Sequence, residues 1–402
     1  MKLTKEEQAM LDGRLGQGMA SAMKVLVGIG KAFGAEEMTR ISKAHISLSN
    51  QEGDLWFVEN LVRQGAKCTV APTVNPAYDY EYFKDYCKID EVDKDIIERT
   101  IDAYRELGAI LTFDCTPYFE NNVPRFGEIC AFSASGGAVH VNSVCGARTN
   151  REAAQSALCA AITGRTPVYG MLKTENRKGD ILVEVEAEIK TEFDYELLGY
   201  YTPLKMGASY HVPVFGGLSK DTSQEALMNL GTQINIHGVV PMYHVVGVTP
   251  EANSLEDAFH GEKIPATITI TKKDIQKAYD LISKGHGKVD FCILGCPHLT
   301  IQQVKGIADM LKGKKLAAQL YIFTSSLTKE LAERMGLLQT IREAGGDLVK
   351  DSCVDQPCWS HLYGKSGITE SPKCAYYTTR RNLSFLVRSI PECIEAALKG
   401  EI

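Results

Sequence analysis

Apolar residues along the chain recur with two alternating periods. Segments with an apolar side chain every three or four positions predict helices, and the short β-branched runs after them predict strands. Helices are expected at 54–66, 94–108, 300–312 and 328–344, and strands at 68–73, 109–113, 291–295, 320–326 and 347–352. This alternation is typical of an α/β fold, and we expect several intertwined lobes at 1–105, 106–260 and 261–402.

The middle of the chain follows a different pattern. Residues 181–193 alternate apolar and acidic side chains, which predicts a half-exposed strand in a mixed or antiparallel region. Residues 234–248 are too rich in Val and Ile for an exposed helix. We therefore expect a β-rich centre between two α/β lobes.

The charge and hydropathy of the chain exclude some classes of binding partner. The 402 residues include 44 basic and 50 acidic side chains, a net charge of −6, without the like-charge run that nucleic-acid binding favours. No apolar run approaches the roughly 18 residues that span a bilayer, and the N-terminus lacks the order of a signal peptide. We expect a cytoplasmic protein that binds neither nucleic acid nor membrane.

Three of the twelve cysteines share one local context. Cys115, Cys296 and Cys353 each follow a helix, a glycine and a predicted strand, and ligands bind at the carboxyl ends of strands in α/β sheets. Three thiolates from remote segments could hold an iron site with one position free of protein. Cys296 followed by Pro297 and His298 also leaves open a thiol nucleophile with a histidine base, while the absence of Cys-x2-Cys pairs disfavours structural zinc.

A polar loop, NSVCGARTNR at 142–151, leads into a predicted helix. Its backbone N–H groups and arginines could bind an anion, or the loop could be a helix cap with surface ion pairs. The glycine-rich segment before it lacks the spacing of a dinucleotide or P-loop motif, so NAD and ATP are not indicated.

Eight ordered motifs resemble the large, catalytic subunit of the aconitase X family. They are FDCTPY (113–118), NVPRFGE (122–128), NSVCGARTNRE (142–152), TGRTPVYG (163–170), ENRKGD (175–180), VVGVTPEA (245–252), LGCPH (294–298) and KDSC (350–353). The resemblance implies an aconitase-like catalytic core over 1–402 and a hydro-lyase with a cysteine-held iron–sulfur cluster. A 4Fe–4S cluster is favoured, with 2Fe–2S or a single iron left open.

The resemblance also implies roles for individual residues. The cluster ligands would be Cys115, Cys296 and Cys353. Catalytic roles are expected for Arg148, Asn150 and Arg151, and for His298 as a donor to the cluster or the leaving group. Substrate contacts are expected from Ser47, Ser49, Glu128, Asn142, Ser143 and Thr149, and on weaker grounds from His45.

Two departures from the family pattern bear on substrate and partner. Ser133, Ala134, Ser135, Gly136 and Gly137 stand where the family has an acidic residue and a small polar pair. The chain also ends at 402 without the swivelling domain that carries a catalytic serine, so we expect a separate small subunit.

Two family substrates are known, mevalonate 5-phosphate and cis-3-hydroxy-L-proline. CTPY, NVPRFGE and Glu152 favour dehydration of mevalonate 5-phosphate to trans-anhydromevalonate 5-phosphate. A non-catalytic iron or redox sensor and a thiol hydrolase are the alternatives from other classes.

Overall fold

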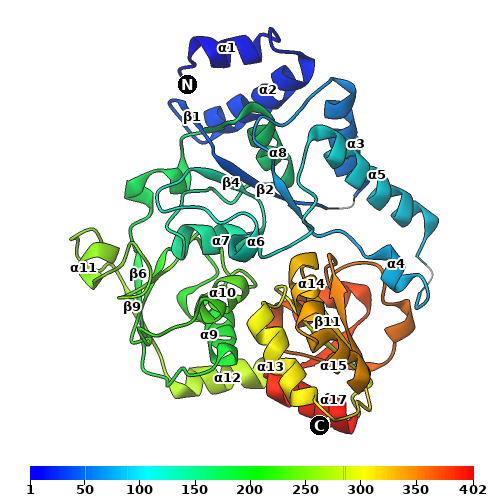
Figure 1. The fold of residues 1–402 in the computed structure, drawn as a ribbon. Helices are drawn as coiled ribbons and strands as arrows, with labels where there is room; N and C mark the ends of the chain where they lie inside the picture. Colours follow the sequence, from blue (N-terminus) through cyan, green and yellow to red (C-terminus); the bar gives the residue numbers. More distant parts are fainter. Residues whose placement is uncertain (50, 88, 284, 286) are drawn as a thin grey trace.

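The computed structural model describes residues 1–49, 51–87, 89–283, 285 and 287–402. Three parallel sheets and one antiparallel strand pair organise these residues, with helices packed around each sheet. In Figure 1 the N-terminal elements lie at the top, the second sheet at the lower left and the third at the lower right, with α6 (Pro117–Glu120) and α7 (Ser135–Ser143) between them. The predicted α/β class is confirmed.

The N-terminal unit contains a three-stranded parallel sheet and a separate strand pair. The sheet has the order β3-β2-β4, with β3 (Thr73–Asn75), β2 (Lys43–Ser47) and β4 (Cys130–Phe132). The antiparallel pair is β1 (Met38–Arg40) with β5 (Arg165–Pro167). The helices of this unit are α1 (Lys5–Leu11), α2 (Gln17–Ala32), α3 (Glu52–Arg63), α4 (Tyr80–Phe83), α5 (Glu91–Leu107) and α8 (Ala154–Thr163).

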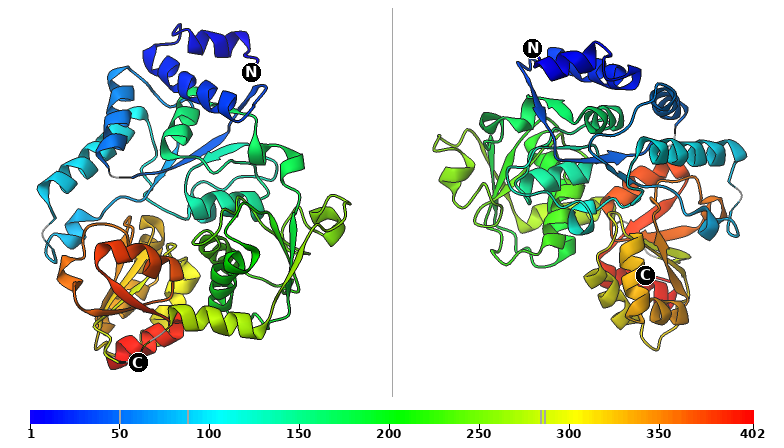
Figure 2. Two further views of the ribbon diagram at one scale, coloured as in Figure 1. Left: turned by 180° about the vertical axis from the view of Figure 1, so that it is seen from behind. Right: turned by 45° about the horizontal axis from the view of Figure 1, so that its top comes forward.

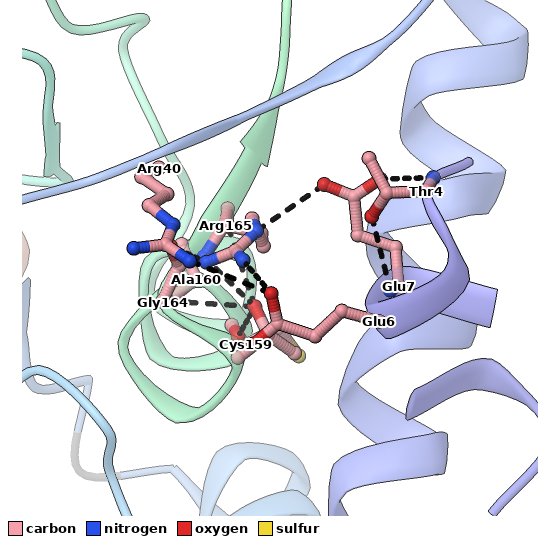
Figure 3. A network of polar contacts seen from close by, with 9 residues as sticks. Thr4, Glu6, Glu7, Arg40, Cys159, Ala160, Gly164 and Arg165 are labelled. Atoms are coloured by element: carbon pink, nitrogen blue, oxygen red, sulfur yellow. Dashed lines mark hydrogen bonds and ion pairs between the residues drawn. The ribbon is translucent and has the colours of Figure 1, made fainter. Parts of the chain in front are cut away.

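A buried ion pair joins α1 to this unit (Figure 3). The Arg165 guanidinium donates to Glu7 Oε1 at 3.2 Å and to Glu6 Oε2 at 2.8 Å. Glu7 also accepts the backbone N–H of Thr4 at 2.8 Å, which closes a capping box at the start of α1. The first helix is therefore held to β5 by charge as well as by packing.

Residues 181–270 form a second parallel sheet of order β8-β7-β6-β9. Its strands are β6 (Ile181–Val185), β7 (Pro213–Gly216), β8 (His244–Val245) and β9 (Thr267–Ile270), and its helices are α9 (Glu192–Met206), α10 (Gln224–Gln233), α11 (Leu255–Ala258) and α12 (Lys272–Ile282). The prediction of a mixed or antiparallel strand at 181–193 is wrong, because β6 pairs in parallel on both sides and ends at Val185. Thr191 then caps α9.

Residues 234–248 form no exposed helix, as predicted, but they contribute little to the β-rich centre that we expected. Only His244 and Val245 form a strand. Asn235 pins the turn before it, since its amide donates to Val240 O and accepts from Val240 N at 3.1 Å each. Most apolar residues of this segment are buried in turns, although Val239 is exposed, so their hydrophobicity reflects burial rather than a strand.

The C-terminal unit is a five-stranded parallel sheet of order β12-β11-β10-β13-β14. Its strands are β10 (Phe291–Leu294), β11 (Gln319–Thr324), β12 (Gly346–Lys350), β13 (Ser366–Thr369) and β14 (Ser384–Val387), and its helices are α13 (Ile301–Leu311), α14 (Ser326–Arg334), α15 (Leu337–Ala344), α16 (Pro372–Thr378) and α17 (Ile390–Lys399). The strands predicted from β10 to β12 and the helix at 300–312 are confirmed. The helix predicted at 328–344 is two helices, because Gly336 adopts φ 72° and ends the first.

Two predicted strands of the N-terminal half are absent from the described residues. At 68–73 only Thr73 belongs to a strand, since Thr69 and Val70 bond to the last turn of α8. At 109–113 a single bridge joins Ile110 to Thr73, and Phe113 then turns away with φ 47°. Short 3-10 helices complete the chain at η1 (Gly170–Leu172), η2 (Thr174–Asn176), η3 (Ser360–Leu362) and η4 (Thr379–Arg381).

The two views of Figure 2 show that the three units surround the middle of the molecule instead of stacking in a row. Among the described helices, none is long and apolar enough to cross a membrane. The division at 105 and 260 stays a prediction, while each of the two larger sheets is built from one continuous stretch of chain, 181–270 and 291–387.

Candidate functional site

Cys115, Cys296 and Cys353 line one cavity of about 180 Å³. Cys296 and Cys353 lie beyond the carboxyl ends of the parallel strands β10 and β12, as predicted. Cys115 does not follow a strand; it lies in the loop between the turn at Phe113 and α6. Segments 181 and 57 residues apart in sequence therefore bring three cysteines to one cavity.

Backbone groups surround these thiols. His298 N–H donates to Cys115 Sγ at 3.3 Å, and Asp355 N–H donates to Cys353 Sγ at 3.4 Å. Burial, followed by the neighbouring Cys115, raises the pKa of Cys353 to about 11. Burial also raises the pKa of Cys296 well above its usual value, and the positive charge of Lys373 opposes the rise.

The donor set fits an iron–sulfur cluster. Thiolates are the ordinary ligands of such clusters, and N–H donors to sulfur tune them. The raised thiol pKa values mean that a cation must be present to hold the cysteines as thiolates at neutral pH. A smaller group of candidate ligand atoms, from Asp114, Cys115 and His298, lies within 4.8 Å of one another, but both ring nitrogens of His298 are bonded to protein acceptors.

Both ring nitrogens of His298 lie within hydrogen-bond distance of protein atoms. Its Nε2 lies 2.8 Å from Ser352 O and its Nδ1 lies 3.3 Å from Asp114 Oδ1. Both partners are acceptors, so both ring nitrogens carry hydrogen. Burial would lower the pKa of His298, but Cys115 and Asp114 raise it well above the usual value. His298 ties the three loops together and has no ring nitrogen left to act as a base.

The opposite wall of the cavity is the N-terminus of α7. Ser135, Gly136 and Gly137 form its first turn and line the cavity, and the N-cap residue Ala134 makes no side-chain cap. The N–H groups of a first helical turn have no partner within the helix and favour anions. A Cβ on Gly136 would lie 3.1 Å from Thr232 Oγ1, so a side chain would crowd this wall.

Lys373 adds a full positive charge beside this helix end. It lines the cavity from α16, and its ammonium donates to Ser135 Oγ at 3.1 Å. The described side chains that line this cavity include no aspartate or glutamate. Asn75 also lines it and is buried, and its Oδ1 has no hydrogen-bond partner among the described residues. The cavity can therefore bind an anion and, through Asn75, a hydroxyl group.

A second, more polar cavity adjoins the first. It shares Ser47, Pro76 and Cys353 with the cysteine cavity and is also lined by Ser49. Arg380 and Arg381 line its far side, where both donate to the carboxylate of Asp355. Of the predicted substrate contacts, Ser47 faces both cavities and Ser49 faces the second.

Three other residues predicted to contact the substrate form hydrogen bonds within the protein. Asn142 donates to Thr149 O and Pro241 O and accepts from Thr149 N–H at 2.9 Å. Ser143 Oγ accepts from Tyr243 N–H at 2.8 Å, and Thr149 Oγ1 accepts from Phe132 N–H at 2.9 Å. Asn142, Ser143 and Thr149 fasten α7 to its neighbours and do not line the cysteine cavity.

The remaining predicted residues also lie outside this cavity. Arg148 Nη1 donates to Leu172 O at 2.8 Å, Asn150 Nδ2 to Tyr169 O at 3.1 Å and Arg151 Nη1 to Asn235 Oδ1 at 3.3 Å. Glu128 accepts a hydrogen bond from Ser42 Oγ at 2.6 Å, and the His45 ring is hydrogen-bonded to Thr73 Oγ1 at 2.8 Å. Burial lowers the pKa of His45 to about 4, so its ring is neutral. Arg151 is exposed, whereas Arg148 is half-buried.

The prediction missed the residues that give the cavity its charge. Tyr118 belongs to the FDCTPY motif quoted above and Asn75 to the segment TVNPA at 73–77, and both line the cavity. Lys373 has no local signal, because its segment shows only a Ser-Pro helix start. The Ser135–Gly137 segment has no nucleotide-binding motif, and the feature that marks it as an anion site is a helix N-terminus without a side-chain cap.

Comparisons with known proteins agree with this architecture. Family models match residues 1–175 (Aconitase X first domain), 179–280 (second domain) and 289–399 (third domain). The Phosphomevalonate dehydratase large subunit of Thermococcus kodakarensis is 35% identical over 398 residues, covering 96% of this chain and 97% of that protein. A Cis-3-hydroxy-L-proline dehydratase of Pseudomonas aeruginosa is 30% identical, covering 98% of this chain and 69% of that protein.

A solved structure has the same fold. The crystal structure of Thermococcus kodakaraensis aconitase X (holo-form) superposes with a TM-score of 0.88 at 33% identity, covering 99% of this chain and all of that one. The relatives that match this chain along nearly its whole length are named as dehydratases. The chain is a hydro-lyase and belongs to the aconitase X family.

Proposed function

We propose that this chain dehydrates mevalonate 5-phosphate with an iron–sulfur cluster held by Cys115, Cys296 and Cys353. The observation that carries the proposal is the convergence of these three thiols with Lys373 and the first turn of α7 in one cavity. When bound, a cluster with one iron position free of protein supplies Lewis-acid activation of the leaving hydroxyl group.

The residues of the chain would bind and orient the substrate. Lys373 and the N–H groups of Ser135, Gly136 and Gly137 bind an anionic group of the substrate by charge-assisted hydrogen bonds. Asn75 Oδ1 accepts a hydrogen bond from a substrate hydroxyl. His298, with both ring nitrogens bonded to acceptors, keeps the Cys115 and Cys353 loops in place as a positioning residue.

The substrate class follows from the charge of the cavity. Mevalonate 5-phosphate carries a carboxylate and a phosphate, and this cavity offers cationic and N–H groups without an acidic side chain. The second cavity shares Cys353 with the first and is lined by Arg380 and Arg381 but also by Asp93 and Asp355, so the other anionic end of the substrate would compete with Asp355 for the two arginines. The ring ammonium of hydroxyproline would find no carboxylate in the cysteine cavity.

The comparisons support the same choice. This chain matches the large subunit of the Thermococcus kodakarensis dehydratase along 97% of that protein, but the hydroxyproline enzyme of Pseudomonas aeruginosa along only 69%. A dehydratase of cis-3-hydroxy-L-proline remains the second candidate, because those enzymes also match this chain over nearly its full length.

We further propose a small partner subunit that covers the cavity and supplies the base. The lining described for this cavity contains no carboxylate, and His298 has no free ring nitrogen, so the proton next to the carboxylate of the substrate needs a base from elsewhere. Relatives named as large subunits are consistent with such a partner. A serine on that subunit would be placed over the cavity mouth.

The thiol-hydrolase alternative is disfavoured by two observations. A nucleophilic cysteine needs a lowered pKa and a base, yet burial raises the pKa of Cys296. The ring of His298 bonds to Asp114 and Ser352 and makes no hydrogen bond with Cys296 among the described contacts.

The test is the metal content of cysteine variants. The chain is purified anaerobically with a co-expressed small subunit, and iron, sulfide and the visible spectrum are measured for the wild type and for Cys115→Ser, Cys296→Ser and Cys353→Ser. Cys145→Ser is the matched control, since Cys145 is also half-buried but does not line the cavity. We expect iron in the wild type and the control and its loss in all three other variants.

Activity is then measured with mevalonate 5-phosphate and cis-3-hydroxy-L-proline in parallel. Water elimination from mevalonate 5-phosphate alone supports the proposal. Turnover of hydroxyproline alone would replace the substrate while keeping the cluster. Wild-type protein without iron after anaerobic purification would overturn the cluster assignment.

A further inference from the structure

A separate cavity of about 470 Å³ lies between the second and third units. The N-terminal turns of α9, α13 and α17 contribute to its wall, and Figure 1 shows α13 next to α9 at this junction. The apolar part of its lining is Phe193, Ile307, Met310, Ile390 and Pro391. Its charged part is four carboxylates, Glu192, Glu196, Glu225 and Glu370, and among the described residues no lysine or arginine lines it.

Two of these carboxylates have local structural roles. Glu192 lies in the first turn of α9 and accepts from Gln303 Nε2 at 2.6 Å. Glu225 lies in the first turn of α10 and accepts from Thr300 Oγ1 at 3.1 Å. Acidic residues are favourable at helix N-termini, and these two bonds join the second unit to α13. They make the cavity acidic without requiring a ligand.

Glu196 has no such explanation. It lies in the second turn of α9, is only 3% exposed and lines the cavity. Its Oε2 is buried and has no hydrogen-bond partner within the described part of the chain. Burial, followed by the charges of Glu370 and Glu192, raises its pKa well above the usual value. A buried acceptor without a donor is unfavourable, and a cationic donor in the cavity would remove this penalty.

The chemistry of the lining favours an organic cation over a metal ion. The described residues hold three metal-ligating groups within 4.8 Å of one another only at Asp114, Cys115 and His298, so the glutamates here do not form a chelating cage. The apolar side chains beside them suit methylene groups. We propose that this cavity binds a small aliphatic amine, with Glu196 accepting a hydrogen bond from its ammonium group.

The site lies next to the cysteine cavity without being part of it. Glu370 lines the amine cavity, and its Oε1 accepts the backbone N–H of Gly295 at 2.7 Å and of Cys296 at 3.4 Å. A bound amine would therefore lie one side chain away from the Cys296 loop. The proposal concerns binding, so it holds or fails independently of the reaction at the cysteines.

Binding of 1,5-diaminopentane to the full chain, in the preparation used for the iron measurement, tests the proposal. Isothermal titration calorimetry gives the Kd, and the Tm is measured with and without the diamine at constant ionic strength. Glu196→Gln keeps the shape and removes the charge. Glu188→Gln is the control, because that side chain is 75% exposed and lies just before α9.

We expect saturable binding and a raised Tm for the wild type and E188Q, and a Kd at least about tenfold weaker for E196Q, as loss of a charge-assisted hydrogen bond predicts. Gln302→Lys, at an exposed position of the lining, places an ammonium group in the cavity and should weaken binding to the same extent. It serves as the second variant if E196Q does not fold.

Three results would overturn the proposal. One is the absence of saturable diamine binding to the wild type. Another is an unchanged Kd in both E196Q and Q302K. The third is a Tm increase with magnesium chloride, lost in E196Q, without one for the diamine, which would assign the cavity to a metal ion.

Discussion

Arg177 is predicted to be the charged residue on which the stability of the central loops depends most. Its side chain is fully buried, and its guanidinium forms a bidentate pair with Glu251. The same group donates to Asn142 O at 2.9 Å and to Met171 O at 3.2 Å. Arg177 thus joins the end of α7, the 170–172 turn and the loop after β8 through one side chain.

The magnitude of Arg177→Met follows from the groups that lose their partner. Glu251 is only 16% exposed and would be left without a counter-ion, which costs roughly 3–5 kcal/mol when a buried pair is broken from one side. The two carbonyl groups each lose a hydrogen bond worth roughly 1 kcal/mol. We expect the free energy of unfolding to fall by about 5–7 kcal/mol in total.

Urea unfolding followed by far-ultraviolet circular dichroism measures this change. The double variant Arg177→Met with Glu251→Met should recover at least half of the loss, because it removes both charges. Arg14→Met is the control, since Arg14 is 75% exposed in its pair with Asp12 and should change stability by less than about 0.5 kcal/mol. A loss below about 1 kcal/mol in R177M, or a double variant as unstable as the sum of the two single ones, would refute the argument.

Three further predictions concern the cavity and pH. Lys373→Met should lower kcat/KM roughly 10–100-fold, because the substrate anion loses a charge-assisted hydrogen bond. The iron content should be unchanged, and Lys373→Arg should recover part of the activity. Wild-type kinetics in K373M would exclude a role of Lys373 in anion binding. Gly136→Val should raise KM at least about tenfold, because the valine side chain would crowd the cavity wall near Thr232. Circular dichroism checks that the variant keeps its fold. An unchanged KM would contradict the assignment of the first turn of α7 to the wall of the substrate cavity. Burial raises the pKa of Glu152 from 4.5 to about 7, so the native state holds a proton that the unfolded state has lost between these pH values. The wild type should therefore lose about 3 kcal/mol of unfolding free energy relative to Glu152→Gln as pH rises from 4.5 to 7; parallel stability curves for the two proteins would contradict this.

The three cysteines proposed as cluster ligands show how far local pattern can lead. Cys296 and Cys353 were expected at strand ends and lie there, since β10 and β12 have strong apolar runs of their own. Cys115 lines the same cavity, but the prediction that it follows a strand is wrong. The strand before it is absent, and the turn at Phe113 carries the loop to the cavity instead.

The polar loop at 142–151 shows the opposite case. Arginines, asparagines and hydroxyl groups in one loop suggested substrate contacts. In the folded protein Asn142, Thr149 and Arg148 donate and accept hydrogen bonds within the chain and lie outside the cysteine cavity. Residue type alone does not reveal whether a polar group faces a ligand or another backbone segment.

The sequence by itself determined the α/β class, most of the C-terminal sheet and the three cysteines, because periodicity, caps and strand ends depend on neighbouring residues. Only the tertiary structure decided that Lys373 meets the first turn of α7, that His298 is held between Asp114 and Ser352, and that Glu196 is left without a partner. Each of these contacts joins groups more than 50 residues apart or depends on burial by several helices. Burial and long-range pairing set the charge and accessibility of a group, and neither is encoded in the residues beside it.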